Sequence, residues 1–192
     1  MRAALGAILS ATLVLGAHTA AGQTTKAKAA KFGVTSTDIR PGATIGSKHI
    51  FSGMGCTGNN LSPALRWTGV PAGTKSFAVT IYDPDAPTGS GWWHWVVYNI
   101  PATTTSLPTG AGDVSGKHLP AGTVQGNTDF GVKAYGGPCP PVGDKPHHYI
   151  ITVYALKVPT LDVPATASSA YVGFNIHANV LASARLTGLY GR

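Results

Sequence analysis

The sequence lacks glutamate entirely and carries few charges of either sign. Among its 192 residues, 14 are Lys or Arg and seven are acidic, and every acidic residue is Asp. Helical bundles and coiled coils depend on long periodic runs of Glu, Lys, Leu and Ala, so this composition disfavours both. Disorder is disfavoured as well, because 43% hydrophobic content with 11% charge is sufficient to bury a core.

Long hydrophobic runs are missing except near the start of the chain. Arg2 precedes an apolar stretch over residues 3–17, and small residues follow at positions 20–22. This layout is typical of a secretory signal peptide, and the stretch is too short for a convincing membrane span. We therefore predict a signal peptide over residues 1–22, a periplasmic or secreted location, and no stable membrane anchor.

The remaining chain has little excess charge. A polar, lysine-bearing stretch over residues 23–31 is expected to be a flexible leader, and residues 32–192 are expected to form one domain. Setting residues 1–31 aside leaves ten basic and seven acidic side chains, a net charge of +3. Basic residues are not interleaved with aromatic ones either, so the sequence predicts no nucleic-acid partner.

Cysteine is scarce, and its two positions, Cys56 and Cys139, form an even pair in a chain predicted to be exported. Such a pair favours a disulfide over a catalytic thiol or a metal site, with two free buried thiols as the alternative. The bridge would close a loop of roughly 80 residues, which the chain-entropy treatment values at about 4 kcal/mol.

Glycine and proline are abundant, at 25 and 14 residues, and they separate short segments that have the character of β-strands. Residues 76–82, 92–100 and 149–156 are rich in β-branched and aromatic side chains and are bounded by Gly, Pro, Asn or Asp. Because no helix intervenes between them, we predict an antiparallel sheet rather than βαβ units.

A single helix is predicted over residues 166–181, where serines at positions 168 and 169 supply a capping signal. Its expected hydrophobic positions are Ala170, Phe174, Val180 and Leu181. From about residue 182, alternation predicts a last strand. The residues expected to share one face of that strand are Ala184, Leu186 and Gly188.

Chemically capable side chains gather at the ends of the predicted strands. Asp83 and Asp85 lie in an Asp-Pro-Asp turn, and they would share one side if the extended conformation continued. His94 lies in a Trp-Trp-His-Trp run. Alternation predicts that the residues on its face are Trp92, Val96 and Tyr98. A purely structural interpretation also stays open, in which the turn only ends the strand and the histidine is an ordinary core residue.

A third cluster combines a Gly- and Pro-rich loop at residues 135–141 with His147, His148 and Tyr149. Alternation places His147 and Tyr149 on one face and His148 on the other. Glycines expose backbone N–H groups and permit positive φ, which is one way to form an anion-binding nest, and the imidazoles and phenol add donors. The glycine loop, the histidines and the tyrosine together indicate oxyanion binding, and the role of the aspartates would be to fix the histidine tautomers. Taken alone, however, a loop of this kind is more often only a turn.

Motifs for catalysis and for cofactors are missing. No H-x-x-x-H, H-x-H or C-x-x-C spacing predicts a metal site. The turn around Ser90 is not the G-x-S-x-G of serine hydrolases, and no phosphate-binding P-loop or dinucleotide-binding glycine motif occurs. We therefore expect no metal, no cofactor and no enzymatic activity.

Four stretches of the sequence match, in order, the motifs of one known family. They are residues 55–67 (GCTGNNLSPALRW), 82–87 (YDPDAP) followed by 93–95 (WHW), 135–141 (YGGPCPP) and 147–149 (HHY). Together they resemble the phosphatidylethanolamine-binding protein family, also called Raf kinase inhibitor-like proteins, and most closely its exported bacterial branch. The resemblance covers residues 32–190, and four motifs in register make it specific.

The resemblance implies a mainly β, sandwich-like fold with a large central antiparallel sheet, a smaller second sheet and a helix near the C-terminus. It also implies a pocket that takes phosphate, phosphorylated head groups or similar anions. The implied pocket residues are Asp83, Asp85, His94, Gly137, His147 and Tyr149, with Trp92 and Trp93 at the rim. A bond between Cys139 and Cys56 would clamp the loop beside this pocket.

The expected function is that of a non-enzymatic periplasmic binding protein for a small anion. Two alternatives stay open. One is a secreted inhibitor or interaction protein that acts on a protease or a host partner, and the other is a hydrolase of small phosphate or acyl substrates that uses His94 or His147 as acid and base. A protein partner and a homodimer also stay open.

Overall fold

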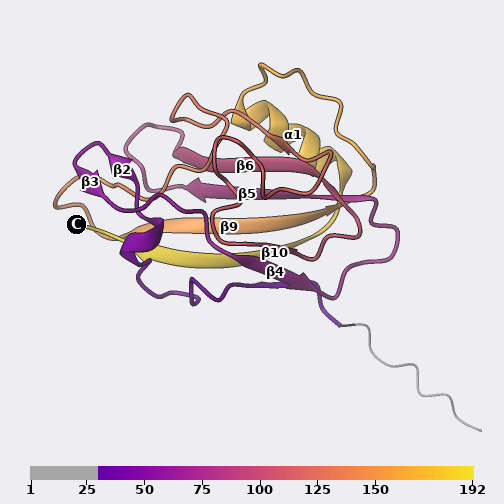
Figure 1. Ribbon diagram of the computed structural model, residues 1–192, viewed down its shortest axis with the longest axis horizontal. Coiled ribbons are helices and arrows are strands. Elements are labelled where there is room, and N and C mark those ends of the chain that lie inside the picture. Colours follow the sequence, from indigo (N-terminus) through magenta and orange to yellow (C-terminus); the bar gives the residue numbers. More distant parts are fainter. Residues whose placement is uncertain (1–29) are drawn as a thin grey trace, which may run out of the picture.

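A large antiparallel sheet occupies the centre of the computed structural model, which describes residues 30–192 (Figure 1). Its strand order is β10-β9-β5-β6-β8. The strands are β5 (Ser76–Asp83), β6 (Trp92–Pro101), β8 (Val124–Gln125), β9 (His147–Leu156) and β10 (Val180–Tyr190). The three predicted strands are the central ones, β5, β6 and β9, and they pair antiparallel, as expected.

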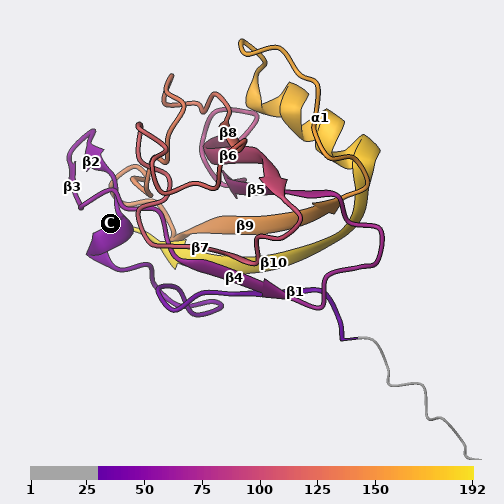
Figure 2. The ribbon, with the colours of Figure 1, turned by 45° about the vertical axis from the view of Figure 1, so that its right-hand side comes forward.

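A second, smaller sheet of order β1-β4-β7 lies over one face of the large sheet, and helix α1 (Ser169–Asn179) lies over the other (Figure 2). The remaining elements are β1 (Gly33–Thr35), η1 (Ser47–His49), β2 (Ser52–Gly53), β3 (Cys56–Thr57), β4 (Leu65–Thr68) and β7 (Ser106–Leu107). The main core fills the space between the two sheets, where Trp67 of β4 packs against Phe77 of β5. The predicted sandwich with one helix is confirmed.

Strand β5 is hydrophobic on both faces because each face packs into a hydrophobic core, one toward the smaller sheet and one toward the helix. Phe77 and Val79 point toward the smaller sheet, whereas Ala78 packs against the helix with Val172 and Ile176. A strand buried on both faces has a near-continuous hydrophobic run instead of a polar and apolar alternation.

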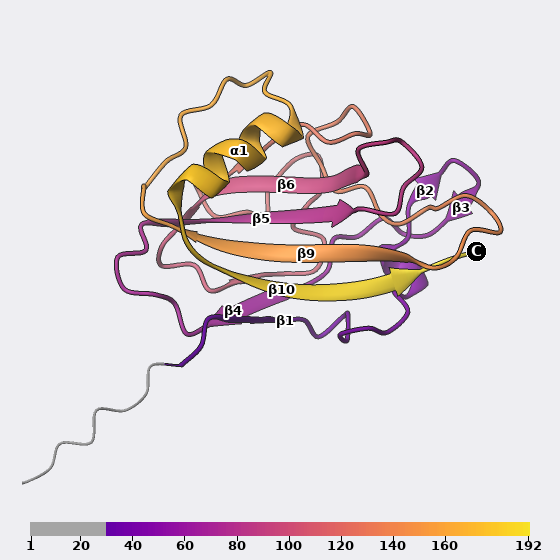
Figure 3. The same cartoon turned by 180° about the vertical axis from the view of Figure 1, so that it is seen from behind.

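Helix α1, which lies beside β5 and β6 in Figure 3, is shorter than predicted, and a different face of it is buried. Ser168 caps it by accepting a hydrogen bond from Tyr171 N, and β10 begins at Val180, inside the span predicted to be helical. The predicted apolar face is wrong, because Phe174 is 73% exposed. Residues four apart share a helix face, and here Val172 and Ile176 supply the buried one.

The last strand follows its predicted alternation. The residues of β10 that are buried on the core side are Ala184, Leu186 and Gly188. The described part of the chain contains no helix that is long and apolar enough to span a membrane. The predicted signal peptide over residues 1–22, and residues 23–29 of the predicted leader, lie outside the part that the structure describes.

A β-bulge in β6 changes the direction of its first side chains. Ile81 of β5 pairs with Trp95, but the next residue, Tyr82, pairs with Trp93, so β6 has one extra residue, His94, at this point. Such a bulge shifts the side-chain alternation of its strand, and bulges are common next to functional sites.

Because of the bulge, the predicted alternation along β6 is wrong beyond His94, although Trp92 and His94 do share a side, where both rings pack against Phe130. Trp93 lies on the helix side, where its ring is 4.6 Å from that of Tyr82. Val96 and Tyr98 also pack on the helix side, whereas His94 contacts Tyr149 on the opposite side. His94 therefore does not share a face with Val96 and Tyr98.

Candidate functional site

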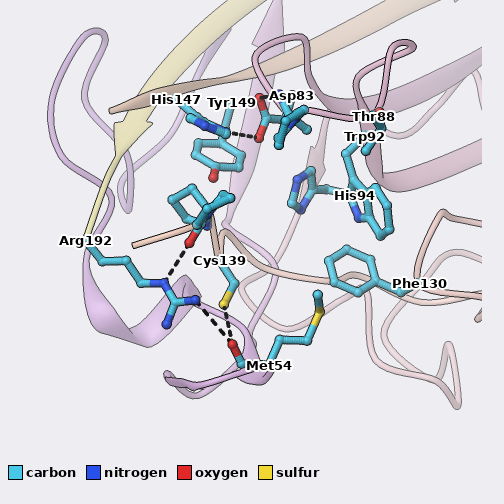
Figure 4. Close-up of a pocket in the computed structure, with 14 residues that line it drawn as sticks. Met54, Asp83, Thr88, Trp92, His94, Phe130, Cys139, His147, Tyr149 and Arg192 are labelled. Atoms are coloured by element: carbon cyan, nitrogen blue, oxygen red, sulfur yellow. Dashed lines mark hydrogen bonds and ion pairs between the residues drawn. The ribbon is translucent and has the colours of Figure 1, made fainter. Parts of the chain in front are cut away.

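A cavity of about 270 Å³ opens at one end of the central strands of the large sheet, where β5 ends and where β6 and β9 begin (Figure 4). The strands contribute Asp83, Trp92, His94, His147 and Tyr149 to its lining. Connecting segments contribute Met54, Ala86, Pro87, Thr88, Phe130, Cys139, Pro140, Pro141 and Arg192. Polar side chains from three strands thus meet under a largely apolar rim.

The structure brings together four of the residues that sequence reasoning assigned to the site, namely Asp83, His94, His147 and Tyr149. It does not place Asp85, Trp93 or Gly137 in the cavity lining. The predicted common face of His147 and Tyr149 is confirmed, since both are buried and line the cavity while His148 is exposed.

Asp83 is the buried acceptor that organises one side of the cavity. Its Oδ2 accepts a hydrogen bond from His147 Nδ1 at 2.8 Å, and its Oδ1 accepts from the backbone N–H groups of Asp85 and Ala86. Burial alone would lower the pKa of His147, but the hydrogen bond and charge of Asp83, with help from Asp144, raise it overall. The raised pKa favours a protonated, positively charged His147.

Asp85 turns away from the cavity because the chain reverses after Asp83. Its Oδ2 accepts from the backbone N–H of His148 at 2.7 Å and lies 2.8 Å from the Nδ1 of the same residue. Burial would raise the pKa of Asp85, yet the hydrogen bonds from His148 lower it overall. The expectation that Asp83 and Asp85 share one side is therefore wrong, since extended geometry ends at the first of them.

His94 is held in one orientation by a backbone carbonyl. Its Nδ1 lies 2.6 Å from Gly136 O, and because a carbonyl can only accept, Nδ1 carries the hydrogen. Burial lowers the pKa of His94 from 6.5 to about 4, so the ring is neutral near pH 7. Its other nitrogen, Nε2, is buried and has no protein partner.

The Tyr149 hydroxyl is the second unsatisfied polar group of the cavity. The side chain is 1% exposed, and its OH has no protein hydrogen-bond partner. Burial, reinforced by the nearby charge of Asp83, raises its pKa above the ordinary value, so the phenol keeps its proton. The Tyr149 and His94 rings meet edge to face with centroids 5.0 Å apart. Trp67 Nε1 and Thr123 Oγ1 are also unpartnered, but neither residue lines the cavity.

The glycine loop does not form the predicted nest. Gly136 N donates to His94 O at 2.9 Å, and Gly137 N donates to Asn60 Oδ1 at 2.7 Å, so both N–H groups are used inside the protein. Neither glycine has positive φ. Gly137 is needed for close packing instead, because a methyl group there would lie within 2.6 Å of Phe51 N and closer still to the carbonyl of His49.

Several covalent and polar contacts clamp this loop against the β2–β3 region. The predicted disulfide is present, with Cys56 and Cys139 Cα atoms 6.0 Å apart and a sequence separation of 83. A loop of that length corresponds to about 4 kcal/mol of stabilisation. Asn60 holds the loop through both ends of its amide, and Arg192 Nε donates to Pro140 O at 2.6 Å.

Sequence reasoning missed Phe130 and Arg192. Phe130 packs edge-on against His94, with centroids 5.4 Å apart, and it is positioned by Asp129, whose Oδ2 accepts from Trp93 N at 2.7 Å. Arg192 follows β10 and donates to the carbonyls of Gly55 and Pro140. Neither residue belongs to a motif, and both reach the cavity only through long-range contacts.

The cavity can therefore offer a hydrogen-bond donor, an acceptor and positive charge to a small molecule. The donor is the Tyr149 hydroxyl, the acceptor is His94 Nε2, Arg192 is positively charged, and the raised pKa of His147 favours its charged form. Across residues 30–192, no group of three or more His, Cys, Asp or Glu side chains is arranged to hold a metal ion.

Comparison with known proteins agrees with this architecture. The sequence profile described as "Phosphatidylethanolamine-binding protein" matches residues 35–191. The chain is 57% identical to the UPF0098 protein YbcL of Escherichia coli strain K12 over 167 residues, covering 87% of this chain and 91% of YbcL. It is 54% identical to YbhB of the same organism over 156 residues, covering 81% of this chain and 97% of YbhB.

Structural similarity and a more distant relative complete the comparison. The crystal structure of E. coli YbcL, described as a new member of the mammalian PEBP family, superposes with a TM-score of 0.83 at 56% identity, covering 85% of this chain and 99% of that one. A Mycobacterium tuberculosis protein named "Putative lipoprotein LppC" is 35% identical over 70% of this chain and 62% of its own length. The match across nearly all of the described fold, in both sequence and structure, places this chain in the phosphatidylethanolamine-binding protein family.

Proposed function

We propose that this chain is an exported, non-enzymatic binding protein whose cavity takes a small oxyanion such as phosphate or a phosphoryl head group. The observation that carries the proposal is the pair of buried polar atoms, the Tyr149 hydroxyl and His94 Nε2, which line one cavity and have no protein partner. Buried polar groups in native proteins are nearly always paired, so two unpaired groups at one cavity favour a ligand that completes them.

The charges around the cavity favour an anion. His147, whose pKa is raised, and Arg192 both line it. The Arg192 guanidinium donates hydrogen bonds to three backbone carbonyls, which carry no net charge. The carboxylate of Asp83 is compensated by His147 and by two backbone N–H groups. Positive potential in a partly enclosed site attracts anionic ligands.

The shape of the cavity supports a phosphoryl compound. Its volume of about 270 Å³ leaves room for a substituent beyond a bare phosphate. The rim near the opening is formed by apolar side chains, among them Met54, Trp92 and Phe130. An apolar rim around a few placed polar groups is the usual construction of a small-molecule site.

A binding role fits the cavity better than hydrolysis. The buried His147–Asp83 pair resembles the base and orienting group of a hydrolase. However, no lining hydroxyl or thiol is activated as a nucleophile beside it, since Thr88 Oγ1 donates to Gly91 O, Cys139 is in the disulfide, and the raised pKa of Tyr149 keeps its phenol protonated. Turnover in an esterase and phosphatase panel that is lost in His147→Asn would instead support an enzyme.

Export is supported by two observations. The Cys56–Cys139 disulfide is of the kind that persists in oxidising compartments. The relative LppC carries a lipoprotein name. Recovery of the protein from the periplasmic fraction, cleaved behind residues 20–22, is the expected outcome; retention in the cytoplasm would contradict this part of the proposal.

Titration of the purified protein with inorganic phosphate tests the binding function. Saturable shifts of the His94 and His147 ring signals in NMR spectra are expected. Tyr149→Phe removes the free donor and should weaken binding by about tenfold or more. Tyr171→Phe is the matched control, because Tyr171 is exposed on α1 and should leave binding unchanged. Absence of any shift at millimolar phosphate would contradict the proposal.

A further inference from the structure

The two unsatisfied groups of the cavity have opposite hydrogen-bonding character. His94 donates through Nδ1 to Gly136 O, and its ring is neutral, so Nε2 carries a lone pair and no hydrogen. The phenol of Tyr149 keeps its proton and makes no hydrogen bond within 3.5 Å, although the nearby Asp83 carboxylate also favours the protonated form. The cavity thus presents one acceptor and one donor on rings whose centroids are 5.0 Å apart.

A fully ionised oxyanion can satisfy only one of these groups. Its oxygens all accept, so it pairs with the Tyr149 hydroxyl but sets a lone pair against the lone pair of His94 Nε2. An oxyanion that keeps one O–H satisfies both groups.

We propose that the cavity selects oxyanions that carry a proton, such as hydrogen phosphate or the monoanion of a phosphate monoester, and that His94 Nε2 accepts the hydrogen bond from the ligand O–H. This inference rests on the proposed anion-binding function and defines which anions the site takes. It differs from a general attraction to negative charge, which would favour sulfate as much as phosphate.

The charged groups that face the site do not supply this selection. Positive charge at Arg192 and at protonated His147 attracts any anion, and it attracts a dianion more strongly than a monoanion, so it does not favour the protonated form. Asp129 also influences His94 through its charge, but its carboxylate is bonded to Trp93 N. Discrimination depends on the Nε2 acceptor alone, because it is the group that a sulfate ion cannot satisfy.

Calorimetric titration of the full protein with four anions at constant ionic strength near pH 7 tests the inference. Near pH 7 inorganic phosphate carries at least one proton in essentially all of its population and methyl phosphate in part of it, whereas sulfate and dimethyl phosphate carry none. We expect phosphate and methyl phosphate to bind at least about tenfold more tightly than the other two, because a site built to pair a hydroxyl rejects analogues that lack it.

The outcomes separate this inference from the proposed function. Sulfate binding as tightly as phosphate would overturn the selection for a proton and leave anion binding in place. Failure of all four anions to bind would overturn the proposed function and the inference together. Dimethyl phosphate that binds as tightly as methyl phosphate would also overturn the selection, since the two differ in the proton.

The variant His94→Asn tests whether His94 Nε2 is the atom responsible for the selection. In His94→Asn the side-chain amide can still donate to Gly136 O, but no acceptor remains at the position of Nε2. Phosphate affinity should fall to the level of sulfate affinity. His177→Asn is the matched control, because His177 Nδ1 makes the same kind of bond, 2.8 Å from Gly173 O on α1, and does not line the cavity. Unchanged preference for phosphate in His94→Asn would overturn the assignment; if that variant does not fold, the anion series on the wild type decides.

Discussion

Acid should destabilise this protein through His94. The unfolded chain binds a proton at this residue below about pH 6.5, whereas burial delays protonation of the folded form until about pH 4. Between these values the unfolded state binds more protons, so stability falls as the pH falls. At about 1.4 kcal/mol per pH unit, the interval corresponds to about 3 kcal/mol.

Two other groups must be separated from this effect. His147 has a raised pKa, so its contribution is fully present below about pH 6.5 and is lost as the pH rises through its folded value, which is the opposite trend. Asp38 has its pKa lowered from 3.8 to about 2: burial would raise it, but a backbone hydrogen bond from Ala64 and bonds from Lys48 and Thr109 lower it. Its contribution is lost only below the window of interest.

Urea unfolding of the wild type and of His94→Asn, with the disulfide intact, isolates the His94 contribution. Both chains retain His147 and Asp38, so the difference in their free energies of unfolding reports on His94. Between about pH 7 and pH 4, the wild type should lose about 3 kcal/mol more of its free energy of unfolding than His94→Asn loses. A difference that stays constant over this range, or an NMR titration of the His94 ring centred near pH 6.5, would refute the reasoning.

Two further predictions test packing in the same urea assay. Gly137→Ala should lower the free energy of unfolding by about 3 kcal/mol or more, because the new methyl group overlaps the backbone of residues 49–51. Gly46→Ala is the control: it has open space around it and should change the free energy of unfolding by less than about 1 kcal/mol. Ile176→Ala should cost about 2–5 kcal/mol and Phe174→Ala less than about 1 kcal/mol, and the reverse order would contradict the buried face assigned to α1.

Alternation predicted the site residues correctly where strand pairing is regular. β9 pairs with β10 without a register shift from Ala155 to His147, so period-two reasoning places His147 and Tyr149 together. The helix cap at Ser168 was also predictable, because capping depends on local chemistry. The cysteine pairing was predictable from the number of cysteines, since only two are available to pair, and from the predicted export.

The same reasoning failed where the backbone departs from regularity. The bulge at His94 is not marked by Gly or Pro, so no residue in the sequence shows that alternation is interrupted there. The glycine loop looked like an anion nest, but Asn60 and the His94 carbonyl take its N–H groups. Phe130 and Arg192 reach the cavity through tertiary contacts, which local patterns do not encode.

The cavity is organised before any ligand arrives, and this has an energetic consequence. The loop that carries Cys139 is fixed by a disulfide, by Asn60 and by Arg192, so binding needs little ordering of its wall. The unsatisfied groups of Tyr149 and His94 each cost about 1–3 kcal/mol in the free protein. The fold tolerates that cost because the strands and the clamp keep both groups from turning toward other partners. A ligand that completes both hydrogen bonds recovers this free energy on binding, whereas one that completes a single bond recovers only part of it.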